Sequence, residues 1–467
     1  MQLNLKRKSA YLGLCPIGKF VFSHEDALVQ KKKIIEKLNK KNIEFCDLEA
    51  IIPDGIVRDQ NQVKSVVDYF KNKGIDALFI PHCNFGTEGA AAMIAKKLSV
   101  PVLLWGPRDG APLQDGTRLR DSLCGVLATS KVLNKLRVPF TYIENSNIED
   151  KVFSQNLDLF LKAATVVKTF KNIRIGQIGV RIDFFWSTII NESELLDKFG
   201  IQILPVDMAD FINDVLERAK KNRRTYIKEI PGINSFLNFN KSNSEEMIIK
   251  SLALRDELLE LAVKEELDSI AIKSFSSLQR ILCDGISIAL SMASEILPIM
   301  GESDIHGAIT SVMLEAATGF KEVSFFPDIT IRHPENDNAV LLWHTIAPFI
   351  LKDLKSEVNV NTPWILKGLS DFTPQYKLKD GPLTLARFDG DNYEYILGIG
   401  QGKTVSGPYT RDFYAWLEVE NWIQWERKLV NGPYIHHCSA IYDHCADILE
   451  EACKYIPGLM VERFDRD

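Results

Sequence analysis

Apolar segments that fit β-strands alternate with amphipathic segments that fit helices through the first third of the chain. The expected strands cover residues 10–15, 43–50, 75–80 and 101–105, and the expected helices cover 26–40, 61–73 and 87–98. Strands that alternate with helices of this length form parallel, doubly wound sheets covered by helices. We therefore predict an α/β domain over residues 1–170.

The same alternation restarts near residue 173. The expected strands cover 173–180, 201–207 and 267–275, and the expected helices cover 192–200, 209–224 and 245–266, with a polar loop at 233–246. The helix at 209–224 has basic residues in its last turn, where the helix dipole favours positive charge. A second doubly wound α/β domain is therefore predicted over residues 171–325.

The pattern changes after residue 330 to short segments of alternating polarity, separated by Gly, Asp and Pro. These segments cover 338–345, 382–389, 393–402 and 432–441, and a helix is expected at 445–456. Regularly spaced short strands are typical of antiparallel sheets and barrels. We predict a mostly antiparallel, barrel-like β domain over residues 326–467.

Composition excludes several classes of protein. A net charge of −6 over 467 residues argues against a nucleic-acid partner. No run of about 20 apolar residues is present, so we expect no membrane span. The eight cysteines form no CxxC pair, which fits reduced thiols in the cytoplasm. Residues 1–18 begin like a signal peptide but lack a small-residue cleavage site, so we expect an ordinary first strand there.

Two expected strand ends in the first domain carry polar or aromatic residues. Asn84 follows the strand at 75–80 and precedes a helix, a position where doubly wound folds bind ligands. Trp105 and Arg108 follow the strand at 101–105, where the indole could stack on a sugar and the guanidinium could bind a substrate or a neighbouring subunit. The structural alternatives are a well-capped turn around Asn84 and an ion pair between Arg108 and Asp109.

Two carboxylates follow apolar segments later in the chain. Glu302 lies in MGESDIHG, where a strand passes into a helix, and Asp328 follows the apolar run ending in FFP. A ligand site is one explanation, because carboxylates at strand ends are well placed for ligands. The alternatives are helix capping, which suits Asp304 better than Glu302, and a turn aspartate at 328.

Three histidines complete the candidate set. His344 ends an apolar segment, and His436 and His437 are adjacent in GPYIHHC. Neighbouring residues of a strand point to opposite faces, so only one of the pair could face a given site. Carboxylate and imidazole ligands without a thiolate suit Mn²⁺, Fe²⁺, Co²⁺ or Zn²⁺, and the oxygen ligands favour Mn²⁺ or Mg²⁺. Such a cation could polarise a sugar carbonyl while a carboxylate moves a proton.

Several stretches together resemble the L-fucose/L-arabinose isomerase family, in its broad fucose isomerase-like group. They are NFGTEGAAAMIAKKLSVPVLLWGPRD, GESDIHGAIT, FPDIT, LLWHTIAPF, LKDGPLTLARFDGDNYEYILGIGQG and GPYIHHCSAIYDHCADILEEACKYIPG, in the family's order and over most of the chain. The resemblance implies two α/β domains and a C-terminal β-rich domain. It also implies a divalent metal, usually Mn²⁺, and a homo-oligomer, usually a hexamer.

The resemblance also implies roles for the candidate residues. Its metal ligands correspond to Glu302, Asp328, His344 and His437, and its base and acid correspond to the two carboxylates. The implied substrate is a free pentose or 6-deoxyhexose of the L-fucose, D-arabinose or L-arabinose type, isomerised through a cis-enediol. Asn84, Trp105, Arg108 and His436 are the expected substrate contacts, in the same subunit or a neighbouring one. Alternatives are a non-catalytic sugar-binding protein and a hydrolase with a carboxylate pair.

Overall fold

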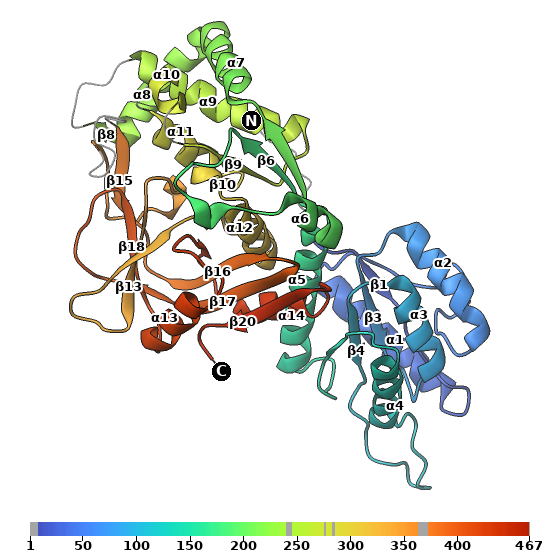
Figure 1. Ribbon diagram of the computed structural model, residues 1–467. Coiled ribbons are helices and arrows are strands. Elements are labelled where there is room, and N and C mark those ends of the chain that lie inside the picture. The colour runs from blue at the N-terminus through green and yellow to red at the C-terminus, as the bar shows by residue number, and fades with distance from the viewer. Residues whose placement is uncertain (1–7, 240–244, 275–276, 283–284, 363–371, 467) are drawn as a thin grey trace. The chain divides into compact units, whose positions relative to one another are not determined.

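The computed structural model in Figure 1 packs into two compact units. It describes residues 8–239, 245–274, 277–282, 285–362 and 372–466, so the predictions for residues 1–7 and the middle of the loop at 233–246 lie outside the described residues. One unit comprises Lys8–Lys168 with Glu450–Pro457, and the other comprises Thr169–Leu449 with Gly458–Asp467. The division of the larger unit at residue 325 stays a prediction.

The smaller unit is built around a parallel sheet with strand order β2-β1-β3-β4-β5, as predicted. Its buried core comes mainly from Val, Ile, Leu and Ala side chains of the strands and of α2 and α3. The elements are β1 (Leu12–Leu14), α1 (His24–Lys40), β2 (Phe45–Cys46), η1 (Gln60–Gln62), α2 (Val63–Lys73), β3 (Ala77–Pro81), α3 (Glu88–Leu98), β4 (Val102–Trp105), α4 (Ser122–Lys135), β5 (Thr141–Tyr142) and α5 (Lys151–Phe170).

A second parallel sheet, with strand order β10-β9-β6-β7, lies in the larger unit. This sheet is also as predicted. Its elements are β6 (Arg174–Ile178), η2 (Trp186–Thr188), α6 (Glu192–Phe199), β7 (Gln202–Val206), α7 (Met208–Lys221), α8 (Arg223–Phe236), α9 (Glu245–Lys264), β9 (Ser269–Ile272), α10 (Ser277–Leu282), α11 (Ile286–Ala293), β10 (Ile299–Met300) and η3 (Gly301–Ser303).

The expected polar loop at 233–246 is partly wrong. Helix α8 continues to Phe236 through Pro231, and β8 (Leu237–Phe239) follows it directly. β8 pairs in parallel with β14 (Val358–Asn361), more than a hundred residues later in the chain. Pairing between distant segments supplies the backbone hydrogen bonds that local sequence does not predict.

The third sheet is mixed, with antiparallel pairs throughout and parallel pairs at β8–β14, β15–β18 and β17–β20. Most of the described pairs are antiparallel, as expected, and the barrel-like form of this part stays a prediction. The remaining elements are α12 (Ile305–Ala317), β11 (Ser324–Phe325), β12 (Asp328–Arg332), β13 (Ala339–His344), η4 (Phe349–Leu351), β15 (Thr373–Lys377), β16 (Pro382–Asp391), β17 (Glu394–Val405), β18 (Phe413–Glu418), α13 (Trp422–Asn431), β19 (Ser439–Ile441), α14 (Ala446–Cys453) and β20 (Leu459–Arg463).

Helix α12 connects the two sheets of the larger unit. It contacts β6, β9 and β10 of the parallel sheet and β11, β16 and β19 of the mixed sheet, and every one of its residues is buried (Figure 1). A helix that is apolar all round is stable only when surrounded on all sides. The turn that leads into α12 carries Glu302 and Asp304, so this packing decides where both carboxylates lie.

No disulfide joins any two of the described cysteines. Among the described helices, none combines the length and the apolar character needed to cross a membrane.

Candidate functional site

Glu302 lies in an unusual turn between β10 and α12. The backbone φ angles of Glu302 and Ser303 are 61° and 57°, in the left-handed region that non-glycine residues rarely adopt. Asp304 then caps α12 by accepting a hydrogen bond from the Gly307 amide at 2.8 Å. Two consecutive residues in this region carry a conformational cost, and such strain is concentrated at functional sites.

Backbone pairing brings Asp328 beside the histidine pair. Asp328 opens β12 and forms an isolated antiparallel bridge with His437. The amide of Ile329 donates to the His436 carbonyl at 2.9 Å, and the amide of Cys438 donates to the Pro327 carbonyl at 3.0 Å. His344, the last residue of β13, lies on the strand that pairs with β12. Two segments over a hundred residues apart thus present their side chains to one place.

The structure brings together Glu302, Asp328, His344 and His437. The Nε2 atom of His437 lies 3.0 Å from Oε2 of Glu302 and 3.6 Å from Oδ1 of Asp328. Nε2 of His344 lies 3.9 Å from Oε1 of Glu302. All four predicted ligands therefore lie together in the larger unit.

Three atoms of this group are buried without a hydrogen bond. They are Glu302 Oε2, Asp328 Oδ1 and His437 Nε2. His437 uses its other nitrogen, Nδ1, for Asp304 Oδ2 at 2.9 Å, so Nε2 can offer a lone pair. Buried polar atoms without partners are costly, and a divalent cation is bound by this type of oxygen and nitrogen atom. The donor set therefore fits a metal ion.

Burial and charge shift the pKa values of these groups in different directions. Burial opposes protonation of His437, but Asp304 and Glu302 outweigh it and raise the pKa to about 10. Burial also disfavours the Glu302 carboxylate, but the neighbouring imidazoles outweigh burial and lower its pKa. At Asp328 burial dominates and raises the pKa. The two carboxyl groups are thus displaced in opposite directions.

His436 does not follow the strand alternation that the sequence suggested. The strand begins only at Ser439, and the His436 side chain is exposed with its ring 4.2 Å from that of His437. Ligand atoms of Asp328, His436 and His437 lie within 4.8 Å of one another. The expectation that His436 faces the opposite side is therefore wrong, because a bend at this residue replaces the regular pleat.

One side of the His436 ring is exposed, and burial of the rest of the ring, together with the neighbouring His437, lowers its pKa to about 4. Aromatic rings flank the pair: Phe326 lies 4.9 Å from the His437 ring, and Phe185 lies 5.8 Å from it. Sequence reasoning missed Phe185. The sequence feature that could have indicated it is a run of three consecutive aromatic residues, Phe184, Phe185 and Trp186. In the structure, Phe184 and Trp186 are exposed.

In the smaller unit, Asn84 and Trp105 have structural partners. Asn84 is buried, accepts from the Lys19 and Gly86 amides and donates to backbone carbonyls. Trp105 is 1% exposed and donates its indole N–H to Ser146 at 3.2 Å. Both side chains are enclosed in the unit's own packing, which favours the structural alternatives, and their roles as substrate contacts stay predictions.

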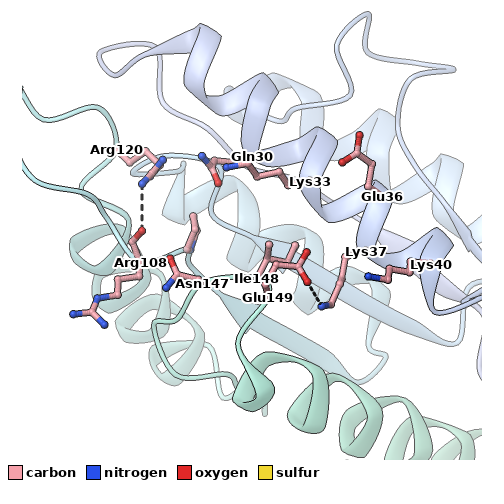
Figure 2. A pocket seen from close by; sticks show the side chains of 11 residues that line it. Gln30, Lys33, Glu36, Lys37, Lys40, Arg108, Arg120, Asn147, Ile148 and Glu149 are labelled. Carbon is pink, nitrogen blue, oxygen red and sulfur yellow. Dashed lines mark hydrogen bonds and ion pairs between the residues drawn. The ribbon is translucent and has the colours of Figure 1, made fainter.

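Arg108 is exposed and lines a pocket of about 490 Å³ in the smaller unit. Figure 2 shows this pocket with Lys33, Lys37 and Lys40 on one wall, and the Arg108 side chain directed away from them. The expected ion pair with Asp109 is absent among the described contacts, since Asp109 pairs with Arg120 at 3.0 Å. Arg108 therefore keeps an accessible guanidinium at the position that the sequence suggested.

The sequence also missed the groups behind His437. Arg387 and Asp389 lie two residues apart on β16, and Asp304 and His306 lie at the start of α12. All four side chains are buried and joined by ion pairs. The sequence feature that could have indicated them is a pair of charged residues two apart in an otherwise apolar strand. Side chains two residues apart on a strand share a face.

Comparisons with known proteins point to one group. Residues 13–171 match the family described as fucose/sulfoquinovose isomerase, N-terminal domain. A sulfoquinovose isomerase from Priestia aryabhattai is 23% identical over 448 residues, covering 93% of this chain and 95% of the relative. A second, from Alkalicoccus urumqiensis, is 25% identical and covers 71% of this chain and 73% of its own length.

A solved structure of a periplasmic solute binding protein from Actinobacillus succinogenes 130z, with bound D-allose, is 11% identical. It covers 67% of this chain and 90% of its own, at a TM-score of 0.17. A score this low does not indicate a shared fold.

Proposed function

We propose that this chain, a fucose isomerase-like sugar isomerase, interconverts an aldose and its ketose with a divalent cation held by Glu302, Asp328 and His437. The observation that carries the proposal is the meeting of two carboxylates and an imidazole in one buried group, where His437 Nε2 lies 3.0 Å from Glu302 Oε2 and 3.6 Å from Asp328 Oδ1. Asp328 Oδ1 has no hydrogen bond, and a divalent cation would satisfy all three atoms at once. His344, 3.9 Å from Glu302, is the proposed fourth ligand.

The carboxylates favour a hard cation, and Mn²⁺ is the first choice because imidazole also takes part. When bound, the cation supplies positive charge that stabilises the negative charge developing on the sugar's first two oxygens. His437 is oriented for this purpose by its Nδ1 contact with Asp304. His436, exposed beside the cluster, is the proposed contact for the substrate itself.

The two carboxylates are the proposed base and acid. Aldose–ketose isomerisation removes a proton from C2 and returns one to C1 through a cis-enediol. Burial raises the pKa of Asp328, whereas the imidazoles lower that of Glu302. Carboxyl groups whose pKa values are displaced in opposite directions suit a division of labour between base and acid. Either carboxylate can take the C2 proton while the other serves as the acid.

Two groups of sugars are candidates. The relatives that span most of the chain carry the name sulfoquinovose isomerase, which makes that 6-sulfonated hexose the first sugar to test. The free pentoses and 6-deoxyhexoses of the L-fucose, D-arabinose and L-arabinose type follow it. In each case the chemistry at C1 and C2 is the same, so the sugars differ only in the groups that the rest of the pocket must accept.

The test supplies the purified protein with Mn²⁺ and this sugar panel in D₂O. We expect one aldose to give a ketose that carries deuterium at C1, detected by NMR, and we expect chelation to stop the reaction and Mn²⁺ to restore it. Asp328→Asn is the matched negative control. No isomerisation and no exchange with any sugar would refute the proposal. Sugar binding without exchange would favour the non-catalytic alternative, and cleavage of glycosides would favour the hydrolase.

A further inference from the structure

A buried network of charged residues lies directly behind His437. Asp304 Oδ2 lies 2.6 Å from Arg387 Nη1, and Arg387 Nε lies 2.8 Å from Asp389 Oδ2. His306 Nδ1 closes the network at 3.1 Å from Asp389 Oδ1. Asp304 and Arg387 are each 1% exposed, so the network is shielded from solvent.

A buried network of this kind is not explained by its contribution to the stability of the fold. Placing charges in the interior costs several kcal/mol per ion before pairing, and apolar residues of similar volume often serve at least as well. Here the carboxylates of Asp304 and Asp389 share the single guanidinium of Arg387, so the pairing leaves one negative charge over. Each carboxylate also has an imidazole partner, His437 beside Asp304 and His306 beside Asp389, and only the first of these belongs to the proposed ligand set.

Asp304 is held in place from three directions. Its Oδ1 accepts from the Gly307 amide at 2.8 Å, which fixes it to the start of α12. Its Oδ2 accepts from both Arg387 at 2.6 Å and His437 Nδ1 at 2.9 Å. Burial disfavours its charged form, but Arg387 and His437 outweigh burial and hold the pKa of Asp304 well below its usual range. These three contacts fix the position and direction of the carboxylate.

The consequence for His437 is a fixed tautomer and ring direction. An imidazole that donates from Nδ1 must carry its lone pair on Nε2 when neutral. Nε2 is the atom that lies 3.0 Å from Glu302 and 3.6 Å from Asp328. The network therefore turns the correct nitrogen toward the acceptor group.

We propose that Asp304, backed by Arg387, is the positioning residue that fixes His437 for metal binding, an inference that rests on the proposed metal centre. Asp304 touches neither the cation nor the sugar and acts only through the imidazole. Asp389 and His306 hold Arg387 from the far side and do not contact His437. Removal of a carboxylate that orients a metal-bound histidine typically weakens metal affinity by about 10- to 100-fold.

The experiment measures Mn²⁺ binding to metal-free protein by calorimetry for the wild type, Asp304→Asn and Asp389→Asn. Asp389→Asn is the matched control, because it removes a charge of the same network at a position that is also buried, but leaves the His437 contact intact. Each titration is run in two buffers of different ionisation enthalpy, so that a change in protons released is separated from the affinity for neutral imidazole. We expect Asp304→Asn to lose about 10- to 100-fold in that affinity and Asp389→Asn to stay within about threefold.

Equal losses in both variants, or no loss in Asp304→Asn, would overturn the assignment. If Asp304→Asn does not fold, Asp304→Ser replaces it, since serine can still cap α12 but cannot reach both Arg387 and His437. The same data separate the two proposals. Absence of Mn²⁺ binding by the wild type counts against the metal centre itself, whereas wild-type binding with an unaffected Asp304 variant counts against the positioning role only.

Discussion

Protons should compete with the metal for His437, which makes metal affinity strongly pH-dependent. Its pKa is raised to about 10, so the imidazole is protonated at neutral pH in the metal-free protein. A cation can bind Nε2 only after that proton leaves. Displacing it at about pH 7 costs roughly 4 kcal/mol, because each pH unit below the pKa costs about 1.4 kcal/mol.

The expected result is a tenfold tighter apparent Mn²⁺ affinity for each unit of pH between about 6.5 and 8.5, with close to one proton released per metal ion. Metal affinity rises with pH because the pKa of His437 is raised: the proton that competes with the metal is lost as the pH rises. Calorimetry in buffers of different ionisation enthalpy measures both quantities. Asp328, whose pKa is also raised, can add to the slope only toward the acidic end.

The adjacent histidine is a built-in control. Burial and His437 lower the pKa of His436 to about 4, so it is already neutral over this range and releases no proton. His436→Gln should therefore keep the slope, whereas His437→Gln should abolish both the slope and most of the affinity. A pH-independent affinity in the wild type, or loss of the slope in the His436 variant alone, would refute this reasoning.

Three further outcomes are expected. Glu302→Gln should lower turnover by about 100-fold or more without unfolding the protein, measured by sugar isomerisation beside circular dichroism, and unchanged turnover would remove Glu302 from the chemistry. Asp412 is fully buried at φ 65°, neither carboxylate oxygen has a hydrogen bond, and burial raises its pKa to about 7. Because the pKa is raised in the folded protein, ionisation of Asp412 destabilises the fold as pH rises. Asp412→Asn should therefore raise the free energy of unfolding in urea by up to about 4 kcal/mol at about pH 8 and change it little near pH 4. A variant as stable as the wild type at both pH values would contradict this. Trp105→Phe should lower the free energy of unfolding by about 1 kcal/mol, because the hydrogen bond to Ser146 is lost, and should leave turnover unchanged. A large fall in turnover at normal thermal stability would instead support Trp105 as a sugar contact.

Local periodicity was sufficient for the two parallel sheets. The strands and helices expected at 75–80, 87–98 and 101–105 correspond to β3, α3 and β4 within a few residues. The two strands are continuous apolar runs and the helix has an apolar face, so each segment can be recognised without knowing its neighbours. The same reasoning failed at β8, where three residues become a strand only through pairing with β14.

The candidate site also has features that the sequence predicted and features that it did not. The family resemblance implied Glu302, Asp328, His344 and His437 as the ligand set, and the type of atom that the candidates offer already indicated an oxygen-and-imidazole metal centre. Strand parity, by contrast, gave the wrong orientation for His436, because the backbone at the pair bends before the strand begins. Trp105 was equally ambiguous, since an aromatic residue at a strand end can face either a ligand or the core.

Sequence by itself determined the alternation that builds the parallel sheets and the chemical identity of the candidate ligands. Only the tertiary structure decided which polar side chains meet, that Asp304 serves both the helix cap and His437, and that Arg387 lies behind them. The reason is physical: periodicity reports how each segment divides between core and solvent. The meeting of residues 302, 328, 387 and 437 depends instead on burying α12 between two sheets whose strands lie far apart in the chain.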